Sequence, residues 1–326
     1  RWATWKFDAV RRGLKLIASH RPHAIWSTFP IPSAHAIGLA LAERSGLPWI
    51  ADFRDPMAQD GYPTDPKLWK AFDGLERRTV AKASGCVFTT PGALRQYTTR
   101  YPELSERFSL IENGYDEESF VAAAAGLSDD GPLRPGAITL VHSGIVYPAE
   151  RDPEALFQAL GRLKQNSFSA PGALVLRFRS PVHEQLLRGL ASKNGVEDMI
   201  EVLPPIPYKE ALREMLRADG LLLMQGASCN EQIPAKTYEY LRARRPLLCL
   251  ADPVGDTATV VRKAGIRSIA ALESADEIVN AMVDFVGKLR AGTSSIAEDH
   301  AVNAASRSGR TAQLVGLLDA LPTFRR

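Results

Sequence analysis

Cysteine is scarce in this 326-residue sequence, which contains only Cys86, Cys229 and Cys249 and no C-x-x-C pair. Such a sparse and odd set argues against a secreted disulfide framework and against a structural zinc site, and it predicts buried free thiols. Apolar runs long enough to span a bilayer are also missing, as is a signal peptide. The sequence begins with Arg1 inside a helical pattern, so we expect further residues upstream.

Motifs for several common chemistries are absent. No G-x-G-x-x-G and no G-x-x-x-x-G-K-[ST] occurs, so the usual sequence arguments for a dinucleotide dehydrogenase and a phosphate-loop ATPase do not apply. H-E-x-x-H and G-x-S-x-G are missing as well, which disfavours a zinc peptidase and a hydrolase with a nucleophile elbow. With 40 basic and 37 acidic residues the net charge is only +3, so the sequence predicts no nucleic-acid partner.

What the sequence does contain is a repeated alternation of short apolar runs with longer amphipathic segments. This pattern is typical of parallel strands covered by helices, and a length of 326 residues suits two domains. We therefore predict an α/β protein with two Rossmann-like domains, over residues 1–120 and 138–304. Residues 121–137, rich in Ala, Gly, Pro and Asp, form the predicted linker. A closing helix within 305–326 is expected to join the first domain.

The predicted strands are short apolar runs bounded by turn residues. They are His23–Thr28, Pro48–Phe53, Gly85–Thr89, Phe108–Glu112, Ile138–His142, Leu174–Phe178, Ile200–Leu203, Gly220–Met224 and Pro246–Leu250. After the first strand we expect a helix capped by Ser33 and ended near Gly46. Residues 301–320 are predicted to form a single helix.

The most informative segment is C-N-E-Q-I-P-A-K-T-Y-E-Y-L, which follows a predicted buried strand. Pro234 suits the first position of a helix. A helix that starts there directs backbone N–H groups and the positive end of its dipole at the preceding loop, as anion sites do. Glu231 in the loop and Glu239 in the helix would flank such a site and accept hydrogen bonds from sugar hydroxyls. From this spacing alone, an exposed loop acid and a helix acid paired with Lys236 or Arg242 is the better supported interpretation.

The segment I-P-A-K-T-Y-E-Y-L-R-A-R-R-P-L-L, which starts at Ile233, resembles the signature of family-4 glycosyltransferases of the GT-B fold, in which P-x-K-x-x-E-Y-L precedes a strand. Glu231 and Glu239 match the E-x7-E pattern of that family. Three further stretches are similar to family segments: the domain-junction N-G-x-D, the loop after the first donor-domain strand, and D-F-R-D-P of a bacterial polysaccharide-synthesis subgroup. They lie at 111–116, 142–153 and 49–56, so the resemblance covers nearly the whole chain.

The resemblance implies a retaining transfer of a hexose from a nucleotide-diphosphate sugar, with no required metal or other cofactor. Glu231 would hold the hexose as a catalytic residue, and Glu239 would hold the ribose. Arg151 and Lys236 would neutralise the leaving diphosphate, whose developing charge fixed cations stabilise. Gly144 would let the backbone approach the phosphates closely. The implied donor-binding residues are Gly144, Arg151, Ile206 (where the family packs the nucleotide base), Ile233, Pro234, Ala235, Lys236 and Glu239.

The acceptor side is expected in the first domain. Asp52, Arg54 and Asp55 come at the end of a predicted strand there, and one of the acids would orient or deprotonate an acceptor hydroxyl as a catalytic group. An ion pair of Arg54 that braces the loop explains the same residues equally well. The family's first domain usually begins with a strand and a Gly-rich loop that this sequence lacks, so we expect this domain to be incomplete at its start.

The expected partners are the nucleotide-sugar donor and a sugar, lipid-linked or small-molecule acceptor. We expect a cytoplasmic protein, with peripheral contact to the inner face of the membrane left open; the sequence does not indicate an oligomeric state. Two alternatives to a transferase also stay open. One is a GT-B epimerase or hydrolase that acts on the nucleotide sugar, and the other is a transferase-like subunit that binds a partner without catalysis.

Overall fold

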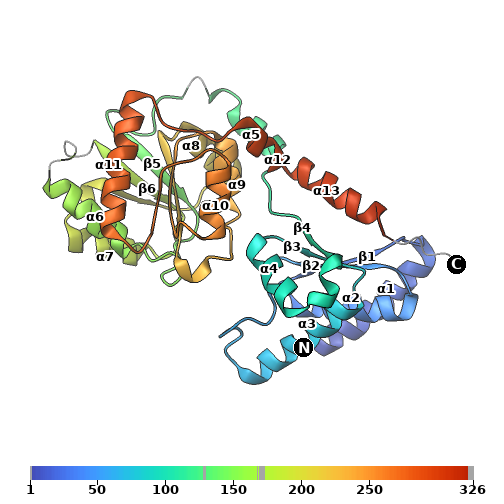
Figure 1. The fold of residues 1–326 in the computed structure, drawn as a ribbon. Helices are drawn as coiled ribbons and strands as arrows, with labels where there is room; N and C mark the ends of the chain where they lie inside the picture. Colours follow the sequence, from blue (N-terminus) through green and yellow to red (C-terminus); the bar gives the residue numbers. More distant parts are fainter. Residues whose placement is uncertain (1, 128–129, 167, 169–172, 322–326) are drawn as a thin grey trace. The chain divides into compact units, whose positions relative to one another are not determined.

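The chain divides into two compact units (Figure 1). The computed structural model describes residues 2–127, 130–166, 168 and 173–321. Unit 1 comprises Arg1–Glu112 and Arg310–Arg326, and unit 2 comprises Asn113–Gly309. Both units are built on parallel sheets, so the predicted α/β class with two Rossmann-like halves is confirmed.

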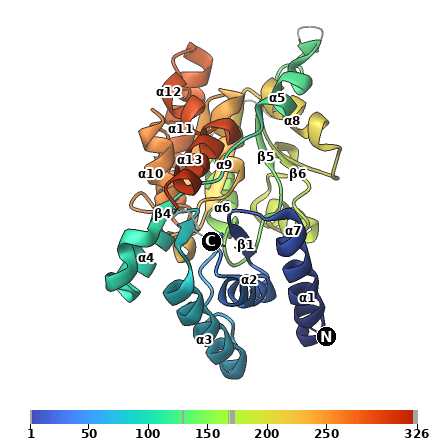
Figure 2. The same cartoon turned by 90° about the vertical axis from the view of Figure 1, so that its right-hand side faces the viewer.

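Unit 1 contains a four-stranded parallel sheet in the order β1-β2-β3-β4. Its strands are β1 (Ile25–Phe29), β2 (Trp49–Phe53), β3 (Gly85–Phe88) and β4 (Phe108–Leu110). Its helices are α1 (Trp2–His20), α2 (Pro32–Ser45), α3 (Pro66–Lys82), α4 (Pro91–Arg100) and the 3-10 helix η1 (Pro102–Arg107). The buried rings of Phe53, Phe88 and Tyr97 pack on one another in the core that α2, α3 and α4 cover. Helix α1 packs alongside α2 (Figure 2).

The start of α2 differs from the prediction. Ser33 does not cap this helix, because Pro32 already occupies its first turn and Ile31 is the residue before it. Proline suits this position, since its fixed φ is helical and its missing N–H would have had no helical partner. The helix ends as expected at Gly46, whose φ of 73° is left-handed.

Unit 2 contains a six-stranded parallel sheet in the order β10-β9-β8-β5-β6-β7. Its strands are β5 (Ile138–Ser143), β6 (Leu174–Arg179), β7 (Ile200–Leu203), β8 (Gly220–Gln225), β9 (Leu247–Ala251) and β10 (Ile269–Ala270). Its helices are α5 (Glu117–Ala124), α6 (Glu154–Gln165), α7 (Glu184–Asn194), η3 (Glu197–Met199), α8 (Tyr208–Arg217), η4 (Ala227–Cys229), α9 (Lys236–Ala243), α10 (Asp256–Lys263), α11 (Ala275–Ala291) and α12 (Asp299–Ala304). Helix α13 (Arg307–Asp319) begins in this unit and continues into unit 1.

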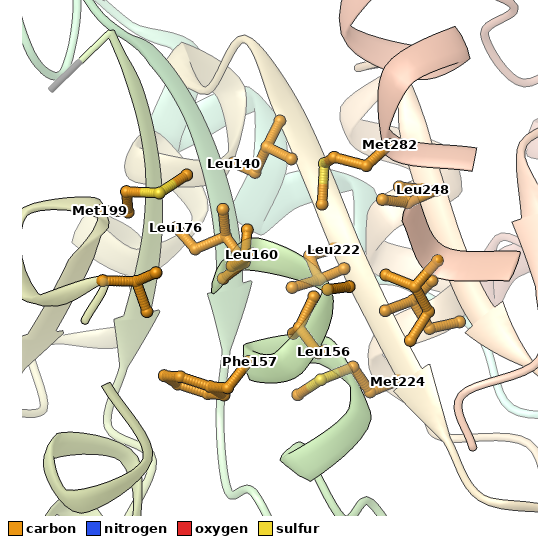
Figure 3. Packing of buried hydrophobic residues seen from close by; sticks show 14 of the residues in the cluster. Leu140, Leu156, Phe157, Leu160, Leu176, Met199, Leu222, Met224, Leu248 and Met282 are labelled. Atoms are coloured by element: carbon orange, nitrogen blue, oxygen red, sulfur yellow. The ribbon is translucent and has the colours of Figure 1, made fainter. Parts of the chain in front are cut away.

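Alternate residues of these strands pack into two separate hydrophobic cores, one on each face of the sheet. On one face Leu140, Leu222 and Leu248 pack with α6, α7 and α11. Figure 3 shows Leu140 and Leu222 near the side chains of α6, and Leu248 near Met282 of α11. On the other face the neighbouring residues Val141 and Leu221 pack with α5, α8, α9, α10 and α12. A strand that is apolar on both faces reads as a continuous hydrophobic run, which is why the sequence marked these strands so clearly.

The predicted linker is partly helical. Positions 121–124 belong to α5, because Phe120 and Ala123 on this helix are fully buried in the second core of unit 2. The division between the compact units therefore falls after Glu112 rather than at 120. Residues 128–129 of the predicted linker lie outside the described part of the chain.

The single helix predicted over 301–320 is two helices, α12 and α13. They separate where Tyr115 intervenes: its N–H donates to the carbonyl of Ala305 at 3.1 Å, and its own carbonyl accepts from Arg307 N at 2.8 Å. The carbonyl of Ala305 and the N–H of Arg307, which a continuous helix would use for its own hydrogen bonds, thus bond to the backbone of Tyr115 instead. Further along α13, Arg310 forms an ion pair with Glu112 at 2.8 Å within unit 1.

Candidate functional site

The residues implied for donor binding gather at one edge of the unit 2 sheet. Strands β5 and β8 are parallel neighbours, so the loops that follow Ser143 and Gln225 emerge side by side at their carboxyl ends. In the sheet order, β6 and β7 follow β5 on one side and β8, β9 and β10 lie on its other side. Open α/β sheets bind ligands at such a switch point. Helix α9 starts at this edge, after the loop that leaves β8.

Gly144 and Lys236 lie close together there. Gly144 has a φ of 104°, a conformation that L side chains rarely adopt, and its N–H donates to the carbonyl of Arg179 at 2.8 Å. A Cβ atom at this position would lie 3.1 Å from the Nζ of Lys236. The glycine therefore leaves both the backbone and the ammonium group of Lys236 approachable.

Lys236 is positioned by His142, which lies on β5 two residues before Gly144. The Nδ1 of His142 lies 2.9 Å from the carbonyl of Leu222, which can only accept, so Nδ1 carries the proton. The Nε2 of the neutral ring is then an acceptor, and it lies 3.1 Å from the Nζ of Lys236. Burial and the nearby Lys236 hold the pKa of His142 well below its ordinary value, which keeps the ring neutral.

The surroundings of Lys236 disfavour its charged form. Burial and, next to it, the guanidinium of Arg151 lower the pKa of this ammonium group from 10.5 to about 7, although Glu239 opposes the shift. A lysine in this range titrates close to neutral pH. An anion placed against it would restore the charged form.

Arg151 supplies the second cation of the site. Its Nε donates to the side-chain oxygen of Gln225 at 3.2 Å, and one terminal nitrogen donates to the carbonyl of Ile145 at 3.2 Å. The guanidinium also lies over the ring of Tyr147, 5.2 Å from its centre. We call Gly144, Arg151 and Lys236 the cationic cradle.

The loop before α9 is tied to three different parts of unit 2. Gly226 N–H donates to the carbonyl of Glu150 at 2.7 Å, Asp256 N–H donates to that of Asn230 at 2.8 Å, and the hydroxyl of Thr257 donates to that of Gln232 at 2.9 Å. These bonds fix the course of the loop on its way into α9.

The first turn of α9 corrects one prediction. Pro234 is not the first helical residue; α9 begins at Lys236, with Ala235 before it. The carbonyl of Pro234 accepts from Thr237 N at 2.9 Å, so the proline is already part of the turn that precedes the helix. Ile233 and Pro234 are buried under this turn, and Ala235 is exposed.

Glu239 lies one turn into α9 and is half-buried. Its Oε1 accepts from the hydroxyl of Tyr208 at 2.7 Å, and Arg242 forms its ion pair with Glu117 instead. The pairing of Glu239 with Arg242 that the spacing suggested is thus not found. Tyr208 was not among the predicted site residues, and its tie to Glu239 could be found only from the fold.

The remaining donor-side residues lie in loops at the same edge. Ile206 is half-buried in the loop after β7, two residues before Tyr208. Glu231 is exposed in the loop that joins η4 to α9. The structure thus brings Gly144, Lys236 and Arg151 together, with Glu239 coupled to Lys236 by charge, while Ile206 and Glu231 stay on the flanking loops.

The acceptor-side candidates lie in unit 1. Asp52 is half-buried at the end of β2, where its carboxylate accepts from the hydroxyl of Thr28 at 2.8 Å. Burial raises the pKa of Asp52, although the bond from Thr28 and the charge of Arg54 oppose the rise. Arg54 and Asp55 are exposed in the loop that follows.

This loop is braced by a residue that sequence reasoning missed. Glu76 of α3 is fully buried and accepts four hydrogen bonds, so it links the loop after β2 to α4. The donors are Ala58 N at 3.1 Å, Tyr97 OH at 2.5 Å, Arg100 at 2.6 Å and Tyr101 OH at 2.8 Å. A buried carboxylate therefore braces this loop, and the charge of Arg54 also acts on Asp52 and Asp55.

The described residues contain no group of three or more His, Cys, Asp or Glu side chains that could hold a metal ion. None of the helices described for this chain is long and apolar enough to cross a membrane. The three cysteines are free and buried, as predicted.

Known proteins show the same architecture. Residues 1–114 match the Glycosyl transferase 4-like domain, whereas no curated protein sequence matches the chain. Anabaena Alr3699/HepE in complex with UDP superimposes with a TM-score of 0.70 at 13% identity, over 96% of this chain and 82% of that one. The α,α-trehalose 6-phosphate synthase of Burkholderia multivorans gives 0.70 at 13%, over 100% and 78%. Sucrose-phosphate synthase of Thermosynechococcus elongatus gives 0.68 at 14%, over 96% and 77%.

These likenesses extend across both units. Because the shared identity is low, they establish the fold rather than the reaction. The chain therefore has the GT-B fold, in which two Rossmann-like units follow one another in the sequence.

Proposed function

We propose that this chain is a glycosyltransferase that moves a hexose from a nucleotide-diphosphate sugar to an acceptor hydroxyl, with retention at the anomeric carbon. The observation that carries the proposal is the cationic cradle, where Lys236 adjoins Gly144 and Arg151 is anchored nearby. Two cations beside an approachable backbone suit a diphosphate. Among the fold neighbours, the Anabaena protein has been seen with UDP, with UDP and glucose, and with UDP-glucose.

The other donor-side residues take roles around the diphosphate. Glu239 has one carboxylate oxygen engaged by Tyr208 and would use the other to accept from the ribose hydroxyls. Glu231 on its exposed loop would accept from the hexose hydroxyls, and the backbone near Ile206 would meet the base. Unit 2 would thus be the donor domain.

The chemical step follows from the charge distribution. As the bond between the anomeric carbon and the diphosphate oxygen breaks, negative charge develops on the diphosphate, and Lys236 and Arg151 stabilise it. The acceptor hydroxyl attacks the same face and its proton passes to the departing diphosphate, which accounts for retention. Asp52 or Asp55 of unit 1 would orient that hydroxyl. Since the cradle already neutralises the leaving group, we propose that transfer requires no added metal.

We place the reaction in polysaccharide or glycoconjugate synthesis, with a sugar or lipid-linked acceptor presented on the cytoplasmic side. The D-F-R-D-P segment at the end of β2 supports this assignment, because it resembles a bacterial polysaccharide-synthesis subgroup. Glu76 supports it too, because its bond from Ala58 N ties the loop after β2 to α3, and a fixed loop can present Asp55 in a fixed position.

The proposal is tested by following nucleoside diphosphate release from a panel of nucleotide sugars, with and without mixed glycan and lipid-linked acceptors. Glu231→Ala should slow acceptor-dependent release roughly 100-fold, since it removes charged hydrogen bonds to the hexose. Glu197→Ala is the matched control, because this exposed acid precedes β7 at the opposite end of the strands. EDTA should leave the wild-type rate unchanged.

The products separate the alternatives. A new glycosidic bond supports the transferase, whereas an epimerised or hydrolysed donor formed without acceptor would replace it with the epimerase or hydrolase. Binding of no nucleotide at all would favour a subunit without catalysis. A Glu231→Ala variant that turns over at the wild-type rate would remove Glu231 from the site.

A further inference from the structure

The pair formed by His142 and Lys236 has a feature that the proposed function leaves unused. Lys236 is held by a neutral imidazole rather than by a carboxylate, at 3.1 Å from Nε2. His142 is fully buried, and its second nitrogen is committed to the carbonyl of Leu222. The ring therefore presents a fixed lone pair to Lys236 and brings no negative charge to it.

The groups that face Lys236 come from three elements. His142 faces it from β5, Arg151 from the loop between β5 and α6, and Glu239 from the first turn of its own helix. Of these, Arg151 opposes a charge on Lys236, and the single carboxylate of Glu239 is shared with the hydroxyl of Tyr208. Without a ligand, the balance leaves Lys236 poised between its two protonation states near neutral pH.

Resting on the proposed function, we propose that His142 is a positioning residue that holds Lys236 for the donor diphosphate, and that donor binding draws a proton from solvent onto Lys236. The proton adds to the lone pair on Nζ and no other bond changes. The ammonium ion then donates to the phosphate oxygens beside Gly144. Recognition of the donor diphosphate is thus coupled to pH.

Arg151 and His142 cannot take this proton instead. Arg151 is already fully charged. Protonation of His142 would place a charge in a buried ring and turn its Nε2 from an acceptor into a donor that faces Lys236. Lys236 is half-buried at the ligand face, so its proton has a path from solvent.

The coupling has a defined sign. The pKa of Lys236, about 7 without ligand, rises when the diphosphate binds, so the complex holds more protons than its parts. Donor affinity should therefore be highest at low pH and fall by about tenfold per pH unit above neutrality. At pH 8 about nine-tenths of a proton should be taken up per donor bound.

The test is isothermal titration of the full chain between pH 6 and pH 9, in buffers of different ionisation enthalpy. The probe is UDP-glucose, or whichever nucleotide sugar of a panel binds best. A nucleotide sugar is preferred over a free nucleoside diphosphate, because its diphosphate is esterified at both ends and does not titrate in this range. The dependence of the measured heat on the buffer gives the protons taken up.

Lys236→Arg separates charge from titration. Arginine keeps the cation but stays protonated across this range, so proton uptake at pH 8 should disappear and the affinity should become nearly independent of pH. Persistent uptake in Lys236→Arg would assign the proton to another group and overturn the inference. Uptake of no proton by the wild-type chain, with normal donor binding, would overturn it as well.

The His142 variants test positioning apart from protonation. At pH 6, below the pKa of about 7, Lys236 of the wild-type chain is mostly charged. At this pH His142→Phe, which lacks an acceptor, should weaken donor binding about tenfold. His142→Gln restores an acceptor and should recover most of that loss. Wild-type affinity in His142→Phe at pH 6 would contradict the positioning role, even if the variant melts at a lower temperature. If no nucleotide sugar binds the wild-type chain at any pH, the proposed function itself fails.

Discussion

At the residue scale, Glu76 and Lys236 differ in how visible they are in the sequence. Lys236 lies in a pattern of proline, lysine and glutamate that family resemblance marked, although the spacing alone favoured ordinary surface acids. Glu76 lies on a helix among charged neighbours and looks like a surface acid. It is buried because Tyr97 and Arg100 of α4, and Tyr101 directly after it, converge on it. The spacing along α3 does not encode this long-range arrangement.

The role of Glu76 can be measured through stability. Glu76→Gln keeps the shape of the side chain but removes its charge. It also replaces one acceptor oxygen with an NH2 group, which can only donate. We expect the free energy of unfolding to fall by about 3 kcal/mol, because several buried donors lose their partner. Urea denaturation followed by fluorescence measures this change.

The matched control is Glu43→Gln. Glu43 is half-exposed on α2 and lies 3.9 Å from Arg78, a surface pair that contributes little. Its substitution should change stability by less than about 0.5 kcal/mol. Equal effects of the two variants would show that the Glu76 network does not hold the loop after β2.

At the element scale, the sequence located the strands well and their surroundings less well. Every predicted strand is found, with ends shifted by at most two residues, because apolar runs mark strands buried on both faces. The errors fall where tertiary contacts decide. Tyr115 divides α12 from α13, and Pro234 precedes α9 instead of beginning it.

The β5–α6 loop gives the prediction that belongs to this scale. Gly144→Ala places a Cβ 3.1 Å from the Nζ of Lys236 and forces a side chain into a φ of 104°. We expect a loss of about 1–3 kcal/mol in stability from the backbone strain. Because Lys236 must move as well, donor affinity should fall at least tenfold, as measured by titration calorimetry.

Gly189→Ala serves as the control for this variant. Gly189 lies on the exposed face of α7, has no atom within 4 Å of an added Cβ, and shares no contact with the cationic cradle. Alanine should stabilise this helix by roughly 0.5–1 kcal/mol and leave donor affinity unchanged. If Gly144→Ala binds the donor as well as Gly189→Ala does, then the diphosphate does not approach the backbone at Gly144.

At the scale of the whole molecule, the fold class followed from the alternation of strands and helices, but the strand order did not. The order β10-β9-β8-β5-β6-β7 places β5 beside β8, although 76 residues separate Ser143 from Gly220. That adjacency brings Gly144 to Lys236 and creates the cradle. Family resemblance could suggest that Gly144 and Lys236 lie in one site. Periodicity alone carries no information about which strands become neighbours.

The two compact units should respond differently to the donor. All residues of the cationic cradle, together with Glu231 and Glu239, lie in unit 2. The acceptor-side residues Asp52 and Asp55 lie in unit 1. Binding of a nucleotide sugar without an acceptor should therefore stabilise mainly the donor-side loops.

Hydrogen–deuterium exchange of the full chain, with and without a saturating nucleotide sugar, tests the central claim most directly. The account predicts the strongest protection in the peptides that cover residues 143–151 and 226–239, where ligand contacts lower local opening. The same experiment with Lys236→Met should show much weaker protection at equal ligand concentration. Protection centred in unit 1, or none in these two segments while the ligand is bound, would contradict the assignment of the donor site.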